Sequence, residues 1–316
     1  IVRHTIFQNS LLAALLDGIY DGEMTIGELL GKGNFGIGTF DALDGEMLIL
    51  DGICYQLRGD GSARIADLDQ GTPFAVATNF VPRIKVQAPR GMRREELSAF
   101  VDEVEPSANY MYAVRITGRF KSVRTRTVVK QSKPYPPMAQ AVGGDKELHF
   151  ENVEGIIGGF RTPVFEKGIS VPGCHVHFID AARCSGGHVL DYVVDEATIE
   201  LCPGTDLEMR LPLTQEFEQA NLAPADLDQQ LHTTEVKIEE LLLVENFFYA
   251  FGPGDGREIH WPLITVDGQR YSTAAPPSTA NILQRDGINV PSLAGDNAQV
   301  SNDEAAPARA VERDTE

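Results

Sequence analysis

Hydrophobic and polar residues alternate over much of the chain, which is typical of β-strands with one buried face. The pattern becomes strand-like from residue 36 onward. The alternation runs through the segments at 62–68, 72–81 and 111–129, and the last of these is long enough for extended paired strands. The Asp51-Gly52 pair between Leu50 and Ile53 indicates a turn. A second strand-rich block covers four segments: VEGIIGGFRTP (153–163), GCHVHFID (173–180), GHVLDYVV (187–194) and ATIELCP (197–203).

Helical spacing occurs in only a few places. Residues 10–31 predict two short helices broken at a Gly-rich turn, and residues 94–104 predict a third helix. A further helix is expected from about 226 to 248, where five apolar residues recur at helical intervals: Leu227, Leu231, Ile238, Leu241 and Leu242. Strands, a helix and more strands indicate an α+β protein with two mixed or antiparallel sheets and few helices.

The Pro- and Gly-rich segment at 130–147 suggests a boundary between two domains. We therefore expect an N-terminal mixed-sheet domain over 1–138 and a C-terminal metal-binding domain with a closing helix over 139–248. Turn signals in 249–276 suggest an appended hairpin. The Ala, Pro, Asn, Asp and Ser content of 277–316 predicts a disordered acidic tail.

The charge balance narrows the choice of partners. The chain has 46 acidic against 27 basic residues, a formal net charge of -19. This argues against nucleic-acid binding, which needs clustered Lys and Arg. The most apolar run, 241–252, is too short to cross a bilayer and contains Glu245. The four cysteines form no CxxC pair and the N-terminal residues lack the order of a signal peptide, so we expect a reduced, cytoplasmic protein.

A glycine motif at 30–38, LGKGNFGIG, matches the pattern G-x-G-x-x-G at Gly31, Gly33 and Gly36. A dinucleotide-binding turn needs a strand before the motif and a helix after it, whereas here the predicted order is the reverse. A kinase would also need V-A-I-K, H-R-D and D-F-G sequences, which do not occur. The motif is therefore interpreted as a turn between a helix and a strand.

Three of the seven histidines lie within one short stretch, as His175, His177 and His188. Residues i and i+2 of a strand share a face, so the first two imidazoles point the same way. Gly186 and Gly187 turn the chain, and His188 can then fold back against the first two. This H-x-H-x10-H pattern predicts a three-nitrogen site for Zn, Cu, Fe or Ni. An open fourth position would be typical of catalytic zinc.

The histidines alone leave other kinds of protein open. They could form a non-catalytic metal-binding protein, with a fourth protein ligand closing the site. They could also belong to another small-molecule metalloenzyme, such as a hydrolase or oxygenase. The H-E-x-x-H pattern of zinc hydrolases is absent. An iron site with two histidines and one carboxylate would leave His188 unexplained.

Three long blocks of the chain resemble acetolactate decarboxylases. They are GFRTPVFEKGISVPGCHVHFIDAARCSGGHVLD (159–191), GNFGIGTFDALDGEMLILDGICYQL (33–57) and GRFKSVRTRTVVKQSKPYPP (118–137). The resemblance covers about residues 5 to 235. It implies a zinc-dependent, homodimeric α/β carboxy-lyase of the acetoin and butanediol pathway. Such an enzyme converts 2-acetolactate to acetoin and CO2 through a metal-stabilised enediolate, without thiamine or pyridoxal cofactors.

The resemblance also implies roles for individual residues. The Zn²⁺ ligands would be His175, His177 and His188, and Arg126 would bind the substrate carboxylate. Glu46 and Glu235 would supply the proton that quenches the enediolate, and Thr39 would line the substrate pocket. The Glu235 match has the least motif character, and which of the two acids protonates the carbon is left open.

Overall fold

A computed structural model of the chain describes residues 3–104, 107, 109–141, 146–234, 264–266 and 269–271. The chain divides into two compact units, Ile1–Phe251 and Gly252–Glu316. In the second unit the described strands β15 (Ile264–Val266) and β16 (Gln269–Tyr271) pair antiparallel, within the range predicted to hold a hairpin. The predicted tail over 277–316 lies outside the described residues.

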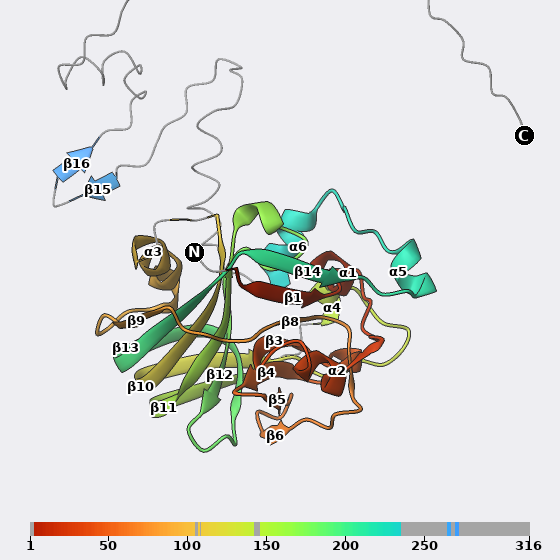
Figure 1. Ribbon diagram of the computed structural model, residues 1–316, viewed down its shortest axis with the longest axis horizontal. Coiled ribbons are helices and arrows are strands. Elements are labelled where there is room, and N and C mark those ends of the chain that lie inside the picture. The colour runs from red at the N-terminus through yellow and green to blue at the C-terminus, as the bar shows by residue number, and fades with distance from the viewer. Residues whose placement is uncertain are drawn as a thin grey trace, which may run out of the picture. The chain divides into compact units, whose positions relative to one another are not determined.

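One sheet of the first unit has seven strands in the order β14-β1-β8-β3-β4-β5-β6 (Figure 1). Neighbouring strands are antiparallel except for the parallel pair β1–β14. The strands are β1 (Thr5–Asn9), β3 (Phe35–Thr39), β4 (Glu46–Leu50), β5 (Ile53–Leu57), β6 (Ala63–Ile65), β8 (Ala75–Thr78) and β14 (Asp206–Arg210). A separate short ribbon pairs β2 (Met24–Thr25) with β7 (Gly71–Thr72).

The second sheet has five antiparallel strands in the order β10-β11-β12-β13-β9. They are β9 (Ile84–Gln87), β10 (Met111–Thr127), β11 (Lys146–Thr162), β12 (Gly173–Asp180) and β13 (Gly186–Gly204). β10 also pairs with β13 over most of its length, so that β10, β11, β12 and β13 form a closed circuit. This closure brings β10 and β13 side by side at the histidine end of the sheet.

Short helices surround the sheets. They are α1 (Leu12–Leu16), α2 (Ile26–Leu30), α3 (Arg94–Val104), α4 (Met138–Ala141), α5 (Gln215–Gln219) and α6 (Leu227–Thr234), with 3₁₀ turns η1 (Asp41–Leu43) and η3 (Val164–Glu166). A capping box between Thr25 and Glu28 starts α2, and Gly31 ends it. The glycine motif therefore runs from the end of α2 into β3, so it connects a helix to a strand, as predicted. The predicted helix over 226–248 is present as α6 up to Thr234, and its remainder lies outside the described residues.

The two sheets pack face to face around a shared apolar core. The core draws Ile37 and Leu48 from the first sheet and Phe160 and Ile179 from the second. Gly158 of β11 permits this approach, because a Cβ there would lie 3.1 Å from Leu48 Cδ1. β4 consequently contacts both β11 and β12. The predicted fold class, an α+β protein with two main sheets and few helices, is confirmed.

The order of the strands does not follow the order of the chain. β9 and β10 precede residue 138 but belong to the second sheet, whereas β14 returns to the first sheet beside β1. The division at 138/139 stays a prediction. Among the described residues, no helix is both long and apolar enough to span a bilayer.

Candidate active site

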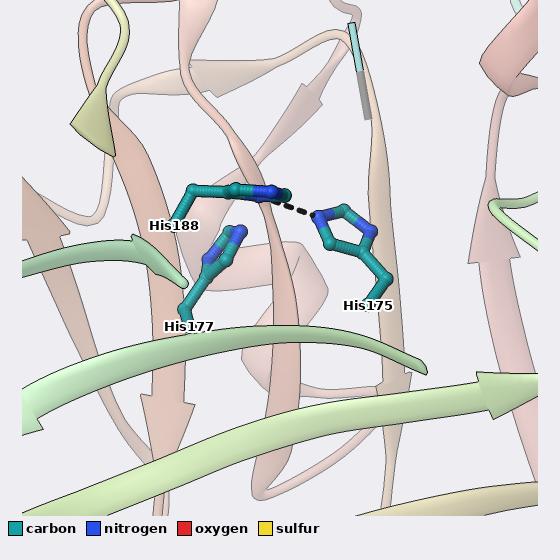
Figure 2. Close-up of side chains that lie close together, drawn as sticks. All are labelled: His175, His177 and His188. Carbon is teal, nitrogen blue, oxygen red and sulfur yellow. Dashed lines mark hydrogen bonds between the residues drawn. The ribbon is translucent and has the colours of Figure 1, made fainter. Parts of the chain in front are cut away.

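The three clustered histidines lie with their rings close together (Figure 2). β12 carries His175 and His177, and β13 carries His188, which lies directly opposite His177 in the strand register. One ring nitrogen from each lies within 4.8 Å of the others. His175 Nε2 is 3.2 Å from His188 Nδ1. The predicted clustering of these three imidazoles is confirmed, and all three are buried.

The nitrogen geometry fits a metal ion. His177 Nδ1 lies 2.8 Å from the carbonyl oxygen of Met47, and because a carbonyl only accepts, this nitrogen is the protonated one. His177 Nε2 therefore presents a lone pair, and this buried atom has no hydrogen-bond partner among the residues that the structure describes. Two ligands on a tetrahedral zinc with Zn–N bonds of about 2.0–2.1 Å are separated by roughly 3.3 Å, close to the 3.2 Å between the His175 and His188 nitrogens.

The surroundings keep the imidazoles neutral, which metal binding requires. Burial lowers the pKa of His177 to about 4, with a smaller contribution from the positive charge of Arg126. Burial also lowers the pKa of His175 and His188 well below the ordinary value. Arg126, Arg94 and the neighbouring imidazoles act in the same direction on both. All three rings are thus available as uncharged ligands near neutral pH.

Arg126 of β10 lies level with His188 and His177 across the neighbouring strands of the second sheet. The register places it opposite His188 of β13, which in turn lies opposite His177 of β12. Its guanidinium donates a hydrogen bond to the backbone carbonyl of Thr234, at the end of α6. The structure therefore places Arg126 near the histidines and adds a contact with α6 that the sequence does not indicate. Its role as an active-site arginine stays a prediction.

Two further predicted residues come from the first sheet. Thr39 on β3 and Glu46 on β4 lie opposite each other, and both are buried. Glu46 Oε2 is 3.7 Å from His177 Nε2. The Thr39 hydroxyl donates to the carbonyl of Gly45 at 2.8 Å, so toward a ligand it can offer an acceptor only. The site is thus built where the two sheets face each other.

A small cavity connects these groups. Its polar lining consists of Thr39, Glu46, His175 and His188, and its apolar lining comes from Leu12, Leu15, Gly38, Leu43, Phe74, Val128 and Met138. The cavity volume is about 20 Å³, which is room for roughly one water molecule. A larger hollow of about 580 Å³ lies over Gly118, Gly155 and Ala197 and contains none of the predicted site residues.

The structure leaves one predicted site residue untested and adds two residues to the site. Glu235 lies outside the described residues, so its position relative to the histidines stays a prediction. Two contributors had no sequence signal: the carbonyl of Met47, which orients His177, and Arg94. Arg94 is buried and donates to the carbonyl of Cys174, the residue before His175, at 3.1 Å. A backbone carbonyl carries no residue-type signature, and Arg94 is distant in sequence from the histidines.

Fold and site together define a two-sheet α+β protein with a buried three-histidine metal-binding site. The chain matches the family described as Alpha-acetolactate decarboxylase over residues 6–224. It is 44% identical to the Alpha-acetolactate decarboxylase of Bacillus subtilis over 73% of this chain and 90% of the relative. Identity to the Klebsiella aerogenes protein of the same name is 42%, over 73% and 88%.

Solved structures agree with the sequence comparison. The crystal structure of the Bacillus subtilis strain 168 protein aligns with a TM-score of 0.72 and 43% identity, covering 74% of this chain and 100% of that one. A Staphylococcus aureus protein of unknown function, described as similar to Alpha-acetolactate Decarboxylase, aligns with a TM-score of 0.70 and 30% identity, over 73% and 100%. The chain belongs to the alpha-acetolactate decarboxylase family. It is therefore an enzyme of the carboxy-lyase class, and the non-catalytic alternative left open by the sequence is not supported.

Proposed function

We propose that this chain converts 2-acetolactate to acetoin and CO2 with zinc as its metal, in acetoin and butanediol formation. The observation that carries the proposal is the convergence of three buried, neutral imidazoles with Arg126 in the same row and Glu46 beside His177. Three neutral nitrogen ligands suit zinc and leave its positive charge uncompensated. The positive charge of Arg126, which lies opposite His188 in the strand register, favours an anionic substrate.

A metal held by the three histidines would supply a Lewis acid that stabilises negative charge on the substrate oxygens as CO2 leaves. The protein's own residues provide the conditions for this chemistry. The Met47 carbonyl fixes the tautomer of His177 so that Nε2 can act as a ligand. Burial of the rings excludes water from the reacting region, which strengthens each electrostatic interaction there.

The proposed role of Arg126 is to bind and orient the substrate carboxylate. A guanidinium matches a carboxylate with two parallel hydrogen bonds. In the present structure Arg126 donates to the Thr234 carbonyl instead, and the cavity is small. A substrate carboxylate would replace this carbonyl as the acceptor and would displace the end of α6. With its carboxylate bound to Arg126, the substrate can be oriented so that the breaking C–C bond is perpendicular to the plane of the ketone. The electrons of that bond can then enter the carbonyl group.

The proposed role of Glu46 is to handle the proton that ends the reaction. Loss of CO2 leaves an electron pair in the adjacent ketone, and the resulting enediolate needs one proton on carbon. Glu46 is buried, lines the cavity and lies beside His177, so its carboxyl group is within reach of a bound substrate. Glu235 is retained as a second candidate acid. Thr39 would accept a hydrogen bond from a substrate hydroxyl on the same side of the cavity.

We also propose that the enzyme is a homodimer and works in the cytoplasm. The cytoplasmic location is proposed because the four cysteines are scattered along the chain and include no CxxC pair.

The proposal is tested by combining metal analysis with an activity assay. Purified protein is assayed for acetoin from racemic acetolactate as isolated, after chelation, and after adding back Zn²⁺, Mn²⁺ or Fe²⁺ separately. We expect one metal per chain, loss of acetoin formation after chelation, and recovery with Zn²⁺. Full acetoin formation by the chelated, metal-free protein would contradict the proposal.

A further inference from the structure

The part of β12 that carries His175 has a neighbouring strand on one side only among the described strands. β12 pairs with β11 over its whole length. Its pairing with β13 covers three residue pairs and ends where His177 lies opposite His188, because the residues of β13 after His188 pair with β10. Gly173–Val176 therefore form an open edge among these strands. Within the histidine cluster, His175 is the residue that lies on this edge.

Helix α3 packs against both β12 and β13 beside this edge. The Met92 carbonyl, just before the helix, accepts from the Val194 N–H of β13 at 2.9 Å, which fixes the start of α3 next to that strand. Leu97 and Val101 of α3 are fully buried and belong to the same core cluster as Cys174. The helix is thus attached through both its backbone and its apolar side chains. A side chain in its first turn consequently has a firm support.

A polar stripe on α3 contacts one cross-strand pair of the second sheet. Arg94, Ser98 and Asp102 are spaced four residues apart, so they lie on one face of the helix. The Arg94 guanidinium donates to the Cys174 carbonyl at 3.1 Å, and Ser98 Oγ is 3.3 Å from Cys174 Sγ. Asp102 forms an ion pair with Arg161 at 2.7 Å. Cys174 and Arg161 lie opposite each other in the register of β12 and β11, one position from His175.

The hydrogen bond from Arg94 acts on the peptide group that joins Cys174 to His175. This group is planar and includes the Cα of His175, so an interaction that fixes its carbonyl oxygen also restricts that Cα. Arg94 is buried, and a hydrogen bond from a charged donor is roughly twice as strong as one between neutral groups. The other two histidines have supports of their own. The Met47 carbonyl contacts His177, and His188 lies between two paired strands.

We propose that Arg94 is a positioning residue of the histidine site. By holding the peptide plane before His175, it keeps His175 Nε2 at the 3.2 Å distance from His188 Nδ1 that a shared metal ion requires. The inference rests on the metal binding in the proposed function, but it does not depend on the reaction. Arg94 acts through the backbone and is not itself a ligand, because a guanidinium stays protonated and offers only donors.

Two possible effects of Arg94 on metal affinity have opposite signs. A positive charge near the site repels a cation, so a residue that acted through its charge alone would weaken metal binding. Its removal would then increase the affinity. A residue that positions a ligand strengthens metal binding, and its removal lowers the affinity by about 10–100-fold, as is typical for the partners of metal ligands. The direction of the change therefore identifies the role.

The experiment measures the dissociation constant of Zn²⁺ from the full chain after the metal has been removed, with a competing chelator as indicator. Arg94→Met keeps most of the buried volume but removes the donor, and we expect about 10–100-fold weaker binding. Arg94→Lys restores a charged donor and should recover most of the affinity. Arg93→Ala is the matched control, because Arg93 is the adjacent residue, its side chain is 50% exposed and its partner is Asp191. Its affinity should match that of the unmodified chain.

A spectroscopic measurement separates positioning from a general loss of stability. Co²⁺ replaces Zn²⁺ in the same samples, and its visible absorption depends on the arrangement of the ligands around the ion. The spectrum should change in Arg94→Met and should return in Arg94→Lys. Circular dichroism and thermal unfolding show whether each variant is folded. If Arg94→Met does not fold, Arg94→Gln takes its place, because this shorter uncharged side chain cannot reach the Cys174 carbonyl in the same way.

The outcomes distinguish the role of Arg94 from the proposed function. Equal or tighter Zn²⁺ binding in a folded Arg94→Met or Arg94→Gln protein would overturn the positioning role. An Arg94→Lys protein as weak as Arg94→Met would overturn it too. If the unmodified chain binds Zn²⁺ but forms no acetoin, the proposed function fails, and the order of the variants in Zn²⁺ affinity still decides the role of Arg94. An unmodified chain that binds no metal would overturn both.

Discussion

The imidazole of His177 donates its Nδ1 hydrogen to the carbonyl of Met47, 2.8 Å away, and so joins the histidine cluster to β4 of the other sheet. Glu46, the residue before Met47, lies 3.7 Å from the opposite ring nitrogen of His177. The histidine and the candidate acid are thus held in a fixed relation by one interaction between the sheets. Substitution of His177 should therefore affect metal binding, whereas substitution of Glu46 should affect proton transfer.

Replacing His177 by Ala should remove metal and activity together. The substitution deletes one of three nitrogen ligands, and since loss of an outer-shell partner alone typically costs 10–100-fold in metal affinity, we expect at least ~100-fold here. Metal content by elemental analysis and acetoin formation are measured on the same sample. His149→Ala is the control, because His149 is an exposed histidine on β11. A metal-free His177→Ala protein with full turnover would refute the ligand role.

Replacing Arg126 by Ala should lower activity while the metal is retained. The guanidinium repels a metal ion, so its removal does not weaken metal binding, but the substrate carboxylate loses its partner. We expect a fall in kcat/KM of roughly 100-fold, on the scale of other charge-stabilising groups. Arg124→Ala, two residues earlier on β10 and near Glu147, serves as the control. Unchanged kinetics in Arg126→Ala would reject the proposed role.

Replacing Glu46 by Gln should reduce kcat more than KM. The amide keeps the size of the side chain but cannot donate or accept a proton in the same way, and general acid–base groups contribute about 10²–10⁴-fold. Metal content should stay at the level of the unmodified protein, since the three histidines are intact. Glu151→Gln, an exposed residue of β11, should behave as the unmodified protein does. Equal turnover in both variants would assign the proton to another group.

The local parts of this structure could be predicted from the sequence. The helix over 94–104 was predicted with the bounds that α3 shows, and the alternation over 111–129 became β10. The histidine cluster was also predictable, because the i, i+2 spacing of His175 and His177 fixes their shared face in any strand. These features depend on residues that are close together in the sequence, and such residues determine the periodicity of hydrophobic positions.

Long-range pairings could not be predicted in this way. β14 pairs with β1 although about two hundred residues separate them in the sequence. The periodicity of hydrophobic positions does not indicate which strands are neighbours in a sheet. The register that sets Arg126 opposite His188 depends on bulges within β10 and β13. The roles of Glu46 and Arg126 therefore came from the family resemblance. The Met47 carbonyl and Arg94 emerged once the sheets were packed together.

Replacing Leu231 by Ala should destabilise the protein and impair substrate binding. Leu231 of α6 is 3% exposed and belongs to the core between the sheets. Truncating a buried Leu to Ala typically costs about 2–5 kcal/mol in the free energy of unfolding. Looser packing of α6 would also disturb the Thr234 carbonyl at Arg126, so KM should change while metal content does not.

The measurement for Leu231→Ala is urea unfolding together with steady-state kinetics. Leu213→Ala is the matched control, because Leu213 is 89% exposed and surface changes usually stay within about 0.5 kcal/mol. An unfolding midpoint for Leu231→Ala equal to that of Leu213→Ala would show that α6 is not anchored through this residue.

Acidification should destabilise the metal-free protein through its buried imidazoles. Burial lowers the pKa of His177 from 6.5 to about 4 in the folded chain. Below pH 6.5 the unfolded chain therefore binds more protons than the folded chain, and the free energy of unfolding falls as the pH decreases. The contribution of the neutral His177 ring to the free energy of unfolding is fully present above pH 6.5 and is lost progressively as the pH falls toward 4. At 1.36 kcal/mol per pKa unit, His177 alone accounts for about 3 kcal/mol.

The experiment compares urea unfolding of the metal-free protein and its His177→Gln variant between pH 8 and pH 4. Gln cannot titrate, so the variant should lose less stability over this range. His175 and His188, whose pKa values are also lowered, act in the same direction and leave part of the slope in place. Carboxylates that titrate near pH 4 contribute equally to both proteins and cancel in the difference. Parallel pH profiles for the two proteins would mean that the pKa of His177 is the same in the folded and the unfolded chain, and the effect of burial described above would then be wrong.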